Sequence, residues 1–328
     1  MPKPIQESQI IQILKVNYAI DALSTQLLPL GADMNAFVYK VNAKPNPYFL
    51  KLKYSNHEET HLAVMQLLHD SDIKEIIFPI AAMDGKLIRQ TDHCKMIVYP
   101  FIDGQNGFEQ KLTKNQWIEF GRTLKKIHTL LVPFSIQIQL RKETLSPKWR
   151  DIVKSLDVEL KVKSENKIAT DFKHFYKSNL TAIYRLVNSA DELCKKIHLD
   201  ANKYVLCHSD IHAGNILITR DGSFYIIDWD EPMMAPKERD LMFIGGGVGN
   251  VWNLSDEAAY FYEGYGMTDI DKTILSYYRH ERIIEDIALY AQDILSFSHN
   301  EQSKLDSFNH FKSMFEPKGV VDIAFSNP

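Results

Sequence analysis

The chain has 328 residues, of which 45% are hydrophobic, so it can bury a sizeable core and is long enough for two lobes. Its formal net charge of −4 at pH 7 gives no support for a surface that binds nucleic acid or an anionic membrane, whereas a pocket for a cationic small molecule is compatible with it. The three cysteines are odd in number and widely spaced, which argues against a disulfide framework and favours a reducing compartment.

The N-terminal residues and the hydropathy pattern point to a cytoplasmic protein. The first residues, "MPKPIQESQIIQILKV", lack the apolar segment of a secretory signal, and no run of about 18 apolar residues occurs in the chain. We therefore expect a protein that is located in the cytoplasm and has no membrane partner.

The first hundred residues have the pattern of a small α/β lobe. Apolar residues at helical spacing predict a helix over 7–18, and the stretch 36–54 reads as two strands around a turn of proline and asparagine. Helical periodicity returns over 57–70, and an apolar strand over 94–102 ends before an Asp-Gly turn signal.

The pattern becomes mainly helical after this strand. The stretch 113–131 begins with a candidate N-cap, Thr113, and carries an apolar stripe. Two short β runs, 215–219 and 224–228, are joined through an Asp-Gly turn signal and predict a hairpin. From Pro232 onward the pattern predicts helices again.

Three oxygen-bearing side chains flank the predicted hairpin. Asp210 lies just before it, Asn215 at its start and Asp228 at its end, so the hairpin would bring them to the same end of two strands. Oxygen ligands suit Mg²⁺, which takes one or two carboxylates together with phosphate oxygens and water. A carboxylate that the metal does not need, Asp210, can orient an attacking hydroxyl or accept its proton. Each residue singly also fits a turn or strand-end role, but the spaced set favours a metal and phosphate site.

The segments "CHSDIHAGNIL" and "IDW" that contain these residues resemble the catalytic loop and the metal-binding segment of the aminoglycoside phosphotransferase and choline kinase family, relatives of the protein kinases. The resemblance implies that Asp210 is the catalytic aspartate and that His208 braces its loop. It also implies that Asn215 and Asp228 hold Mg²⁺. A later segment, "APKERDLMFIG", resembles the family's segment in which an aspartate, here Asp240, stabilises the catalytic loop.

The resemblance further implies an α+β, two-lobed protein-kinase-like fold. Residues 1–102 would form a small N-terminal nucleotide-binding lobe with an antiparallel sheet and a hinge at its end. Residues 103–328 would form a mainly helical C-terminal lobe that carries the catalytic hairpin and the substrate site.

The segments expected to bind ATP lie in the first lobe. "LPLGADMNAFVYKV" resembles the family's loop over the nucleotide phosphates and places Asp33 and Asn35 before a strand, although its single glycine also fits an ordinary turn. In "YFLKLKY", Lys51 and Lys53 share one face of a strand. The family pattern favours Lys51 as the residue that neutralises phosphates, whereas a solvated lysine face fits Lys53 better.

Two further parts of a nucleotide site follow from the resemblance. A glutamate on the helix after the lysine strand would hold Lys51, and we prefer Glu59 to Glu58 for this role. The strand "MIVYPFIDG" ends where the hinge between the lobes would lie, so its backbone groups are candidates for pairing with adenine. The residues concerned are Tyr99, Phe101 and Ile102.

The acceptor of the phosphoryl group is expected to be a small molecule. No "DFG" follows the catalytic loop and no "APE" follows a long activation segment, which disfavours a protein kinase. Carboxylates can pair with substrate ammonium groups, and aromatic faces can hold methylated amines. The candidate substrate residues, each with a solvated or structural role as the alternative, are Asp230, Trp229, Glu263 and Glu281.

Within the family, "LGADMNAFVYKV", "NPYFLKLKY" and "VLCHSDIHAGNILI" are most similar to members that phosphorylate spectinomycin. This implies ATP- and Mg²⁺-dependent phosphorylation of the 9-hydroxyl of an aminocyclitol antibiotic, which gives resistance. Separately from the resemblance, we expect a monomer. The alternative is a choline, homoserine or methylthioribose kinase-like activity, because these relatives share the catalytic set. A non-catalytic nucleotide-binding protein ranks lower, since the aspartates, asparagine and lysine of that set are all present.

Overall fold

The computed structural model describes residues 5–28, 36–54, 60–91, 94–162, 164–246, 251–296 and 300–326. The chain forms two compact units. The first contains Met1–Asn106, Phe134–Gln139 and Ile216–Asp230, and the second contains Gly107–Pro133, Leu140–Asn215 and Glu231–Pro328. The hairpin segment Ile216–Asp230 therefore belongs with the N-terminal residues, whereas we expected it in the C-terminal part.

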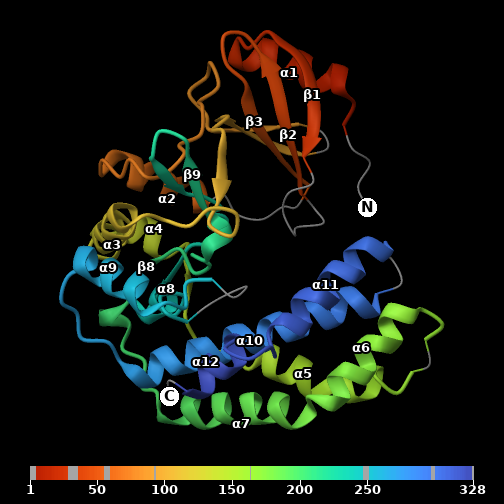
Figure 1. The fold of residues 1–328 in the computed structure, drawn as a ribbon. Helices are drawn as coiled ribbons and strands as arrows, with labels where there is room; N and C mark the ends of the chain where they lie inside the picture. Colours follow the sequence, from red (N-terminus) through yellow and green to blue (C-terminus); the bar gives the residue numbers. More distant parts are fainter. Residues whose placement is uncertain are drawn as a thin grey trace. The chain divides into compact units, whose positions relative to one another are not determined.

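The first unit is built on a five-stranded antiparallel sheet (Figure 1). Apolar and polar residues alternate along one of its strands, so that Leu50 and Leu52 are fully buried on one face while Lys51 and Lys53 lie on the other. In spatial order the strands are β1 (Ala22–Leu28), β2 (Ala36–Ala43), β3 (Tyr48–Lys53), β5 (Lys95–Pro100) and β4 (Ile88–Gln90).

Helix α1 (Glu7–Tyr18) covers the buried face of this sheet. Its bounds match the predicted helix, and its apolar residues Ile10 and Leu14 join the core formed by β2, β3 and β5. Helix α2 (Thr60–Asp70) confirms the predicted helical periodicity in the part of that segment that is described. The short helix α4 (Phe134–Gln137) completes the helices of the first unit.

A second sheet in the first unit has three strands. Its order is β10 (Phe224–Ile226), β9 (Ile216–Thr219) and β6 (Gly104–Asn106). β9 and β10 are antiparallel, with Ile216 opposite Ile226, which confirms the predicted hairpin. The turn between them contains Gly222 at a φ of +88°, a conformation that glycine adopts without steric cost.

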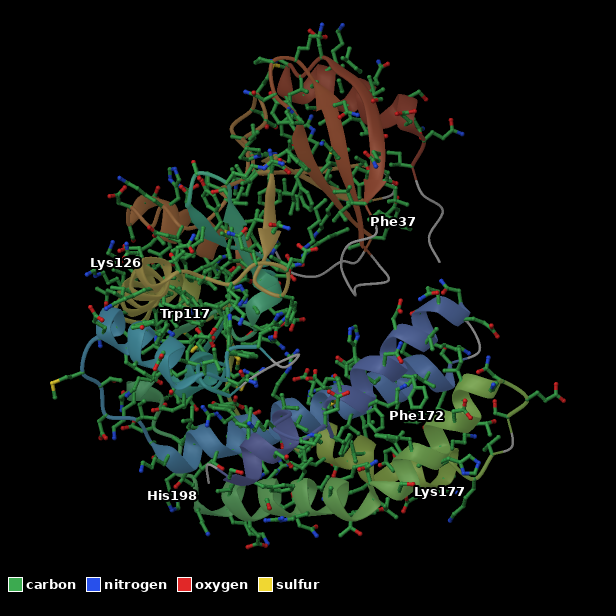
Figure 2. All side chains as sticks on the ribbon, viewed as in Figure 1. Phe37, Trp117, Lys126, Phe172, Lys177 and His198 are labelled. Carbon is green, nitrogen blue, oxygen red and sulfur yellow. The ribbon has the colours of Figure 1, made fainter. Side chains whose placement is uncertain are left out.

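The second unit is mainly helical. The 24-residue helix α10 (Lys272–Leu295) packs against helices on several sides. Phe172, labelled in Figure 2, is fully buried. Its ring contacts the rings of Phe308 and Phe311 and so joins two of these helices. The helices around α10 include α5 (Lys148–Glu159), α6 (Lys167–Ser178), α7 (Leu180–Lys196), α11 (Glu301–Ser313) and α12 (Val320–Ser326).

A small three-stranded sheet lies in the second unit. Strand β11 (Met233–Ala235) pairs antiparallel with β8 (Val205–Cys207) and parallel with β7 (Arg141–Lys142). The prediction of helix directly after Pro232 is therefore wrong at its start, because three buried apolar residues here form a strand. The one-turn helix α8 (Glu238–Leu241) follows β11, and two 3₁₀ turns cover Ala201–Lys203 and Ala213–Asn215.

Helices α3 (Lys114–His128) and α9 (Ser255–Tyr265) of the second unit touch backbone to backbone. The predicted N-cap, Thr113, is confirmed, since its hydroxyl accepts the backbone N–H of Gln116. A Cβ atom at Gly264 would lie 1.8 Å from the carbonyl oxygen of Ile118, and one at Gly121 would lie 2.1 Å from that of Phe261. Only glycine permits this approach.

In the described part of the chain, no helix has both the length and the hydrophobicity needed to cross a bilayer.

The close approach of α3 and α9 predicts that Gly264→Ala destabilises the protein. Alanine favours a helix over glycine by about 1 kcal/mol, but the new methyl group would overlap a backbone oxygen that cannot move aside, at a net cost of about 2 kcal/mol or more. Urea denaturation measures the difference. Asn115→Ala, at an exposed position of α3, is the matched control. Equal stability of the two variants would show that the helices can separate without cost.

Candidate active site

The lysine face of β3 meets carboxylates from the segment that follows β10, all within the first unit. Lys51 Nζ lies 2.6 Å from Asp230 Oδ2 and 3.1 Å from Asp228 Oδ1. Lys53 Nζ lies 2.8 Å from the same oxygen of Asp230. The Lys53 side chain is only 13% exposed, so the expected solvated lysine is wrong at this position. The reason is that Asp230, from a distant part of the sequence, pairs with it.

Charge pairing keeps this cluster ionised. Burial opposes the positive charge of Lys51, but the carboxylates of Asp228 and Asp230 outweigh it, and the pKa of Lys51 is raised. Burial likewise opposes the negative charge of Asp230, but Lys51 and Lys53 outweigh it and lower the pKa of Asp230 to about 2. At neutral pH, Asp230 is therefore a carboxylate between two ammonium groups.

Asp228 occupies an unusual backbone conformation. Its φ of +63° lies in the left-handed region, which residues other than glycine adopt only at an energetic cost. Its carboxylate side chain is 51% exposed. The neighbouring Trp229 is buried, and its Nε1–H donates to the carbonyl oxygen of Ile226 at 3.1 Å. The turn thus leaves Asp228 accessible while its neighbour is packed against β10.

In the second unit, the loop after β8 is held by a buried aspartate from α8. Asp240 accepts the backbone N–H of His208 at 2.9 Å and that of Ser209 at 2.7 Å. Ser209 has a φ of +74°, again in the left-handed region. Nδ1 of His208 accepts the backbone N–H of Asp210 at 3.3 Å. These bonds stabilise a strained backbone directly before Asp210.

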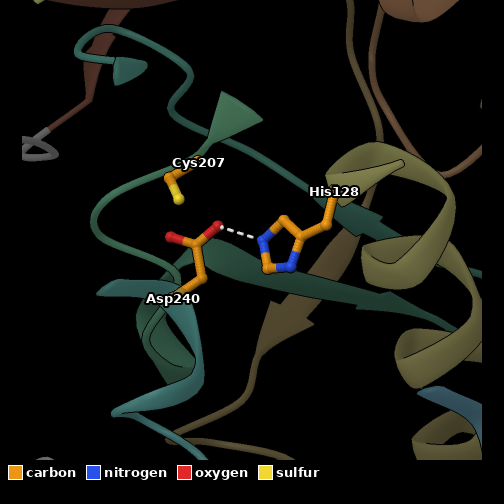
Figure 3. A group of neighbouring side chains, drawn as sticks. All are labelled: His128, Cys207 and Asp240. Carbon is orange, nitrogen blue, oxygen red and sulfur yellow. Dashed lines mark hydrogen bonds and ion pairs between the residues drawn. The ribbon is translucent and has the colours of Figure 1, made fainter. Parts of the chain in front are cut away.

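Asp240 also contacts His128 and lies beside Cys207, as Figure 3 shows. His128 Nε2 lies 3.0 Å from Asp240 Oδ2, and its Nδ1 lies 2.8 Å from the hydroxyl of Tyr265. A carboxylate only accepts, so in the neutral ring Nε2 donates to Asp240 and Nδ1 accepts from Tyr265. The three residues have potential metal-ligating atoms close together. However, His128 and Asp240 already form hydrogen bonds with each other, and Asp240 also accepts those of the loop. This buried group is therefore structural.

The carboxylate of Asp210 lies between two basic side chains. Arg282 Nη1 is 2.5 Å from Oδ1, and His212 Nε2 is 3.5 Å from Oδ2. Nδ1 of His212 accepts the N–H of Gly214 at 2.9 Å, which leaves the proton on Nε2 to face Asp210. The Asp210 side chain is 41% exposed, so part of the carboxylate remains open. Its backbone oxygen accepts Nδ2–H of Asn215 at 2.8 Å.

These basic neighbours set the charge of Asp210. Burial favours the neutral acid, but the hydrogen bond from His212 and the charge of Arg282 outweigh it, and the pKa of Asp210 lies below its ordinary value. Asp210 is therefore a carboxylate that can accept a hydrogen bond but not donate one at neutral pH.

Two of the predicted substrate residues have other partners in the second unit. Oε1 of Glu281, which is buried, lies 2.8 Å from Nε of Arg150. Burial raises the pKa of Glu281 to about 7, although Arg150 opposes the shift. Glu263 is exposed and lies 3.7 Å from Nζ of Lys114. Glu281 is thus placed for a structural ion pair, and Glu263 for a solvated one.

The predicted hinge residues lie at the end of β5 and directly after it. Tyr99 lies opposite Phe49 of β3, and the backbone N–H of Phe101 donates to the carbonyl oxygen of Pro47 at 3.3 Å. Ile102 is half-buried in the segment between β5 and β6. The other predicted nucleotide-site residues, Asp33, Asn35, Glu59 and its alternative Glu58, lie outside the described residues.

Sequence reasoning missed Arg282 and His212 as neighbours of Asp210. His212 lies within the segment that carries the family resemblance, so its proximity to Asp210 was visible in the sequence. Arg282 and Asp286 have the i,i+4 spacing of a helical ion pair, and Nε of Arg282 indeed lies 3.1 Å from Asp286 Oδ1. Nothing in that spacing indicates that Arg282 also reaches Asp210.

The sequence model of the phosphotransferase enzyme family matches residues 26–273 of this chain. A comparison with curated proteins found no match. Among solved structures, spectinomycin phosphotransferase APH(9)-Ia in complex with ADP and spectinomycin is 57% identical over 99% of each chain, with a TM-score of 0.95. The AMP-bound complex of the same phosphotransferase is 55% identical over 98% of this chain and 99% of that chain, with a TM-score of 0.91.

More distant structures share the fold. The microcompartment-associated aminopropanol kinase is 16% identical over 93% of this chain and 94% of that chain, with a TM-score of 0.64. The mixed α+β architecture, with an antiparallel N-terminal sheet and a helical C-terminal part, matches the protein-kinase-like fold expected from the sequence.

The bonds to Asp240 predict that Asp240→Asn destabilises the protein. An amide keeps the shape of the side chain, but its NH₂ group cannot accept the N–H donors that Asp240 now satisfies, at a cost of about 1–3 kcal/mol. Chemical denaturation at neutral pH measures the loss. Asp171→Asn, the same substitution at an exposed site on α6, should change stability far less. An Asp240→Asn protein as stable as the wild type would contradict the role given to this carboxylate.

Proposed function

This chain belongs to the phosphotransferase enzyme family, and on that premise we propose that it transfers the γ-phosphoryl group of ATP to a hydroxyl of spectinomycin. The observation that carries the proposal is the 57% identity, over 99% of both chains, to a phosphotransferase whose structure holds ADP and spectinomycin. The sequence resemblance described above points to the 9-hydroxyl of the aminocyclitol ring as the acceptor. Phosphorylation there would give resistance to the antibiotic.

A choline, homoserine or methylthioribose kinase-like activity is the alternative. The structures of choline kinase and aminopropanol kinase are 15% and 16% identical to this chain, a level at which the likeness concerns the fold alone. They therefore favour no particular acceptor.

On the nucleotide side, we propose that Lys51 neutralises the phosphates of ATP. Its ammonium group is held by two carboxylates in the first unit, at 2.6 and 3.1 Å, so its position is fixed before any ligand binds. Lys53 shares Asp230 with Lys51 and keeps that carboxylate in place. Asp33 and Asn35, together with the backbone of Tyr99, Phe101 and Ile102, remain proposed contacts to the nucleotide. Glu59 remains the proposed glutamate partner of Lys51.

We propose that Asn215 and Asp228 hold Mg²⁺. Both supply oxygen atoms, which this hard cation prefers. Nδ2 of Asn215 is engaged with the backbone of Asp210, so the amide oxygen is the group left for a metal. Asp228 has an exposed carboxylate on a strained turn, a feature common at functional sites. A bound Mg²⁺ would neutralise charge on the phosphate oxygens.

Asp210 is the proposed catalytic residue. Its ionised carboxylate would accept the hydrogen bond of the acceptor hydroxyl and orient its oxygen toward the γ-phosphorus. The acceptor oxygen then bonds to phosphorus as the bond to ADP breaks, and the hydroxyl proton moves to Asp210. His208 contributes by its bond to the backbone N–H of Asp210. Asp230, Trp229, Glu263 and Glu281 stay candidates for contacts to the substrate.

We propose that the enzyme acts as a monomer. The cytoplasm is the proposed location, because it supplies ATP and a reducing environment in which the free cysteines Cys94, Cys194 and Cys207 persist.

Asp210→Asn should lower the rate of ADP release in the presence of spectinomycin by about 10²–10⁴-fold, the usual contribution of a positioned base. Nucleotide affinity, measured by calorimetry with ADP, should stay within a few-fold of the wild type, because Asp210 is assigned to the acceptor. Asp171→Asn should behave as the wild type. An unimpaired Asp210→Asn enzyme would remove this residue from the reaction.

The acceptor is tested by a panel of spectinomycin, a 2-deoxystreptamine aminoglycoside, choline, homoserine and methylthioribose, each with Mg·ATP. Only spectinomycin should raise the rate of ADP release, and mass spectrometry should show one added phosphate. A faster reaction with choline, homoserine or methylthioribose would establish the alternative function. Tight ADP binding without turnover of any compound would indicate a non-catalytic nucleotide-binding protein.

A further inference from the structure

Arg282 is a half-buried cation that the proposed catalytic scheme does not use. It lies on α10, and its side chain is 18% exposed. Nη1 is 2.5 Å from Asp210 Oδ1, and Nε is 3.1 Å from Asp286 Oδ1. Its Cζ atom lies 5.8 Å from the centre of the Phe243 ring. A planar guanidinium held by two carboxylates beside an aromatic ring has little freedom to rotate.

Asp286 explains why an arginine is stable at this depth. A guanidinium charge that is largely removed from water is costly unless carboxylates nearby compensate it. Asp286 follows Arg282 by one helical turn and supplies a second carboxylate from the same helix. Arg282 is therefore oriented by α10 itself and does not depend on Asp210 to hold its position.

Because of Arg282, the two carboxylate oxygens of Asp210 differ in their hydrogen bonding. Oδ1 accepts a short charge-assisted hydrogen bond from Arg282. Among the described residues, the ion-pair partner of Oδ2 is His212, at the longer distance of 3.5 Å. Since 41% of the Asp210 side chain is exposed, Oδ2 is the oxygen left to receive another donor.

We propose that Arg282 is a positioning residue for phosphoryl transfer, which fixes the rotation of the Asp210 carboxylate so that Oδ2 faces the acceptor hydroxyl. The inference rests on the proposed function, in which the proton of the acceptor hydroxyl moves to Asp210 as the new P–O bond forms and the bond to ADP breaks. Arg282 neither gives nor takes a proton in this step. It removes the alternative rotations in which neither oxygen is aligned with the acceptor.

The test compares Arg282→Met, Arg282→Lys and the wild type by the rate of ADP release with Mg·ATP and acceptor. Arg282→Met should lower kcat by about 10–100-fold, the effect of a misplaced reacting group, with each KM within about threefold. Arg282→Lys should give an intermediate kcat, because an ammonium group can pair with Asp210 but cannot bridge two carboxylates as a fork. If the Arg282→Met protein does not fold, the kcat of Arg282→Lys alone tests the inference. An unchanged kcat in the folded variants overturns the inference.

A double-mutant cycle with Asp210→Asn separates positioning from a general structural effect. If Arg282 acts through Asp210, Arg282→Met should lower the residual kcat of Asp210→Asn by less than about twofold. If the two substitutions lower kcat independently, so that their effects multiply in the double mutant, the inference is wrong. Arg279→Lys is the matched control, since Arg279 lies on the same helix and donates to the carbonyl oxygens of Met242 and Ile244. Its kcat should equal that of the wild type.

The proposed function and the inference fail in different ways. If spectinomycin does not raise the rate of ADP release, the proposed acceptor is wrong. The double-mutant cycle is then measured with a compound that does raise the rate of ADP release, or with water as the acceptor in slow ATP hydrolysis. Coupling between Arg282 and Asp210 in that reaction supports the inference, and its absence overturns it.

Discussion

The loop that precedes Asp210 depends on one buried carboxylate, that of Asp240. The loop passes through a left-handed conformation at Ser209, and such a turn persists only where its surroundings determine it. Asp240 provides this by accepting the N–H groups of His208 and Ser209, while His128 donates to it from α3. A buried carboxylate must have its oxygens satisfied, so the network favours a single arrangement. The position of Asp210 is therefore set by residues to which no substrate contact is assigned.

In each unit, basic side chains keep a carboxylate ionised although burial opposes its charge. In the first, Asp230 stays charged because two lysines of β3 pair with it, and in the second, Asp210 stays charged because Arg282 and His212 do so. Burial alone would favour the neutral acid in both places. Phosphoryl transfer relies on fixed charges that need no reorganisation during the reaction. The overall charge of −4 gave no indication of these local arrangements.

The elements that local sequence determines were predictable. The alternation along β3, the turn between β9 and β10, the N-cap Thr113 and the bounds of α1 each follow from neighbouring residues. Strand β11 was missed because three buried apolar residues carry no periodicity. The pairing of Lys53 with Asp230 and that of Arg282 with Asp210 were missed because each joins distant parts of the chain. Motif spacing singled out Asp210, but only the folded structure shows that Arg282 reaches it.

Cys207, beside Asp240, is a natural probe of local opening in the second unit. Its thiol lies at the end of β8 and is 3.6 Å from the carbonyl oxygen of Pro236, and burial raises the pKa of the thiol. Alkylating reagents attack the thiolate, so Cys207 is protected for as long as β8 and β11 stay paired. The half-buried Cys194 on α7 provides an internal reference in the same protein. The rate of Cys207 labelling, relative to Cys194, therefore reports on the opening of the sheet that precedes the loop of Asp210, without any engineered probe.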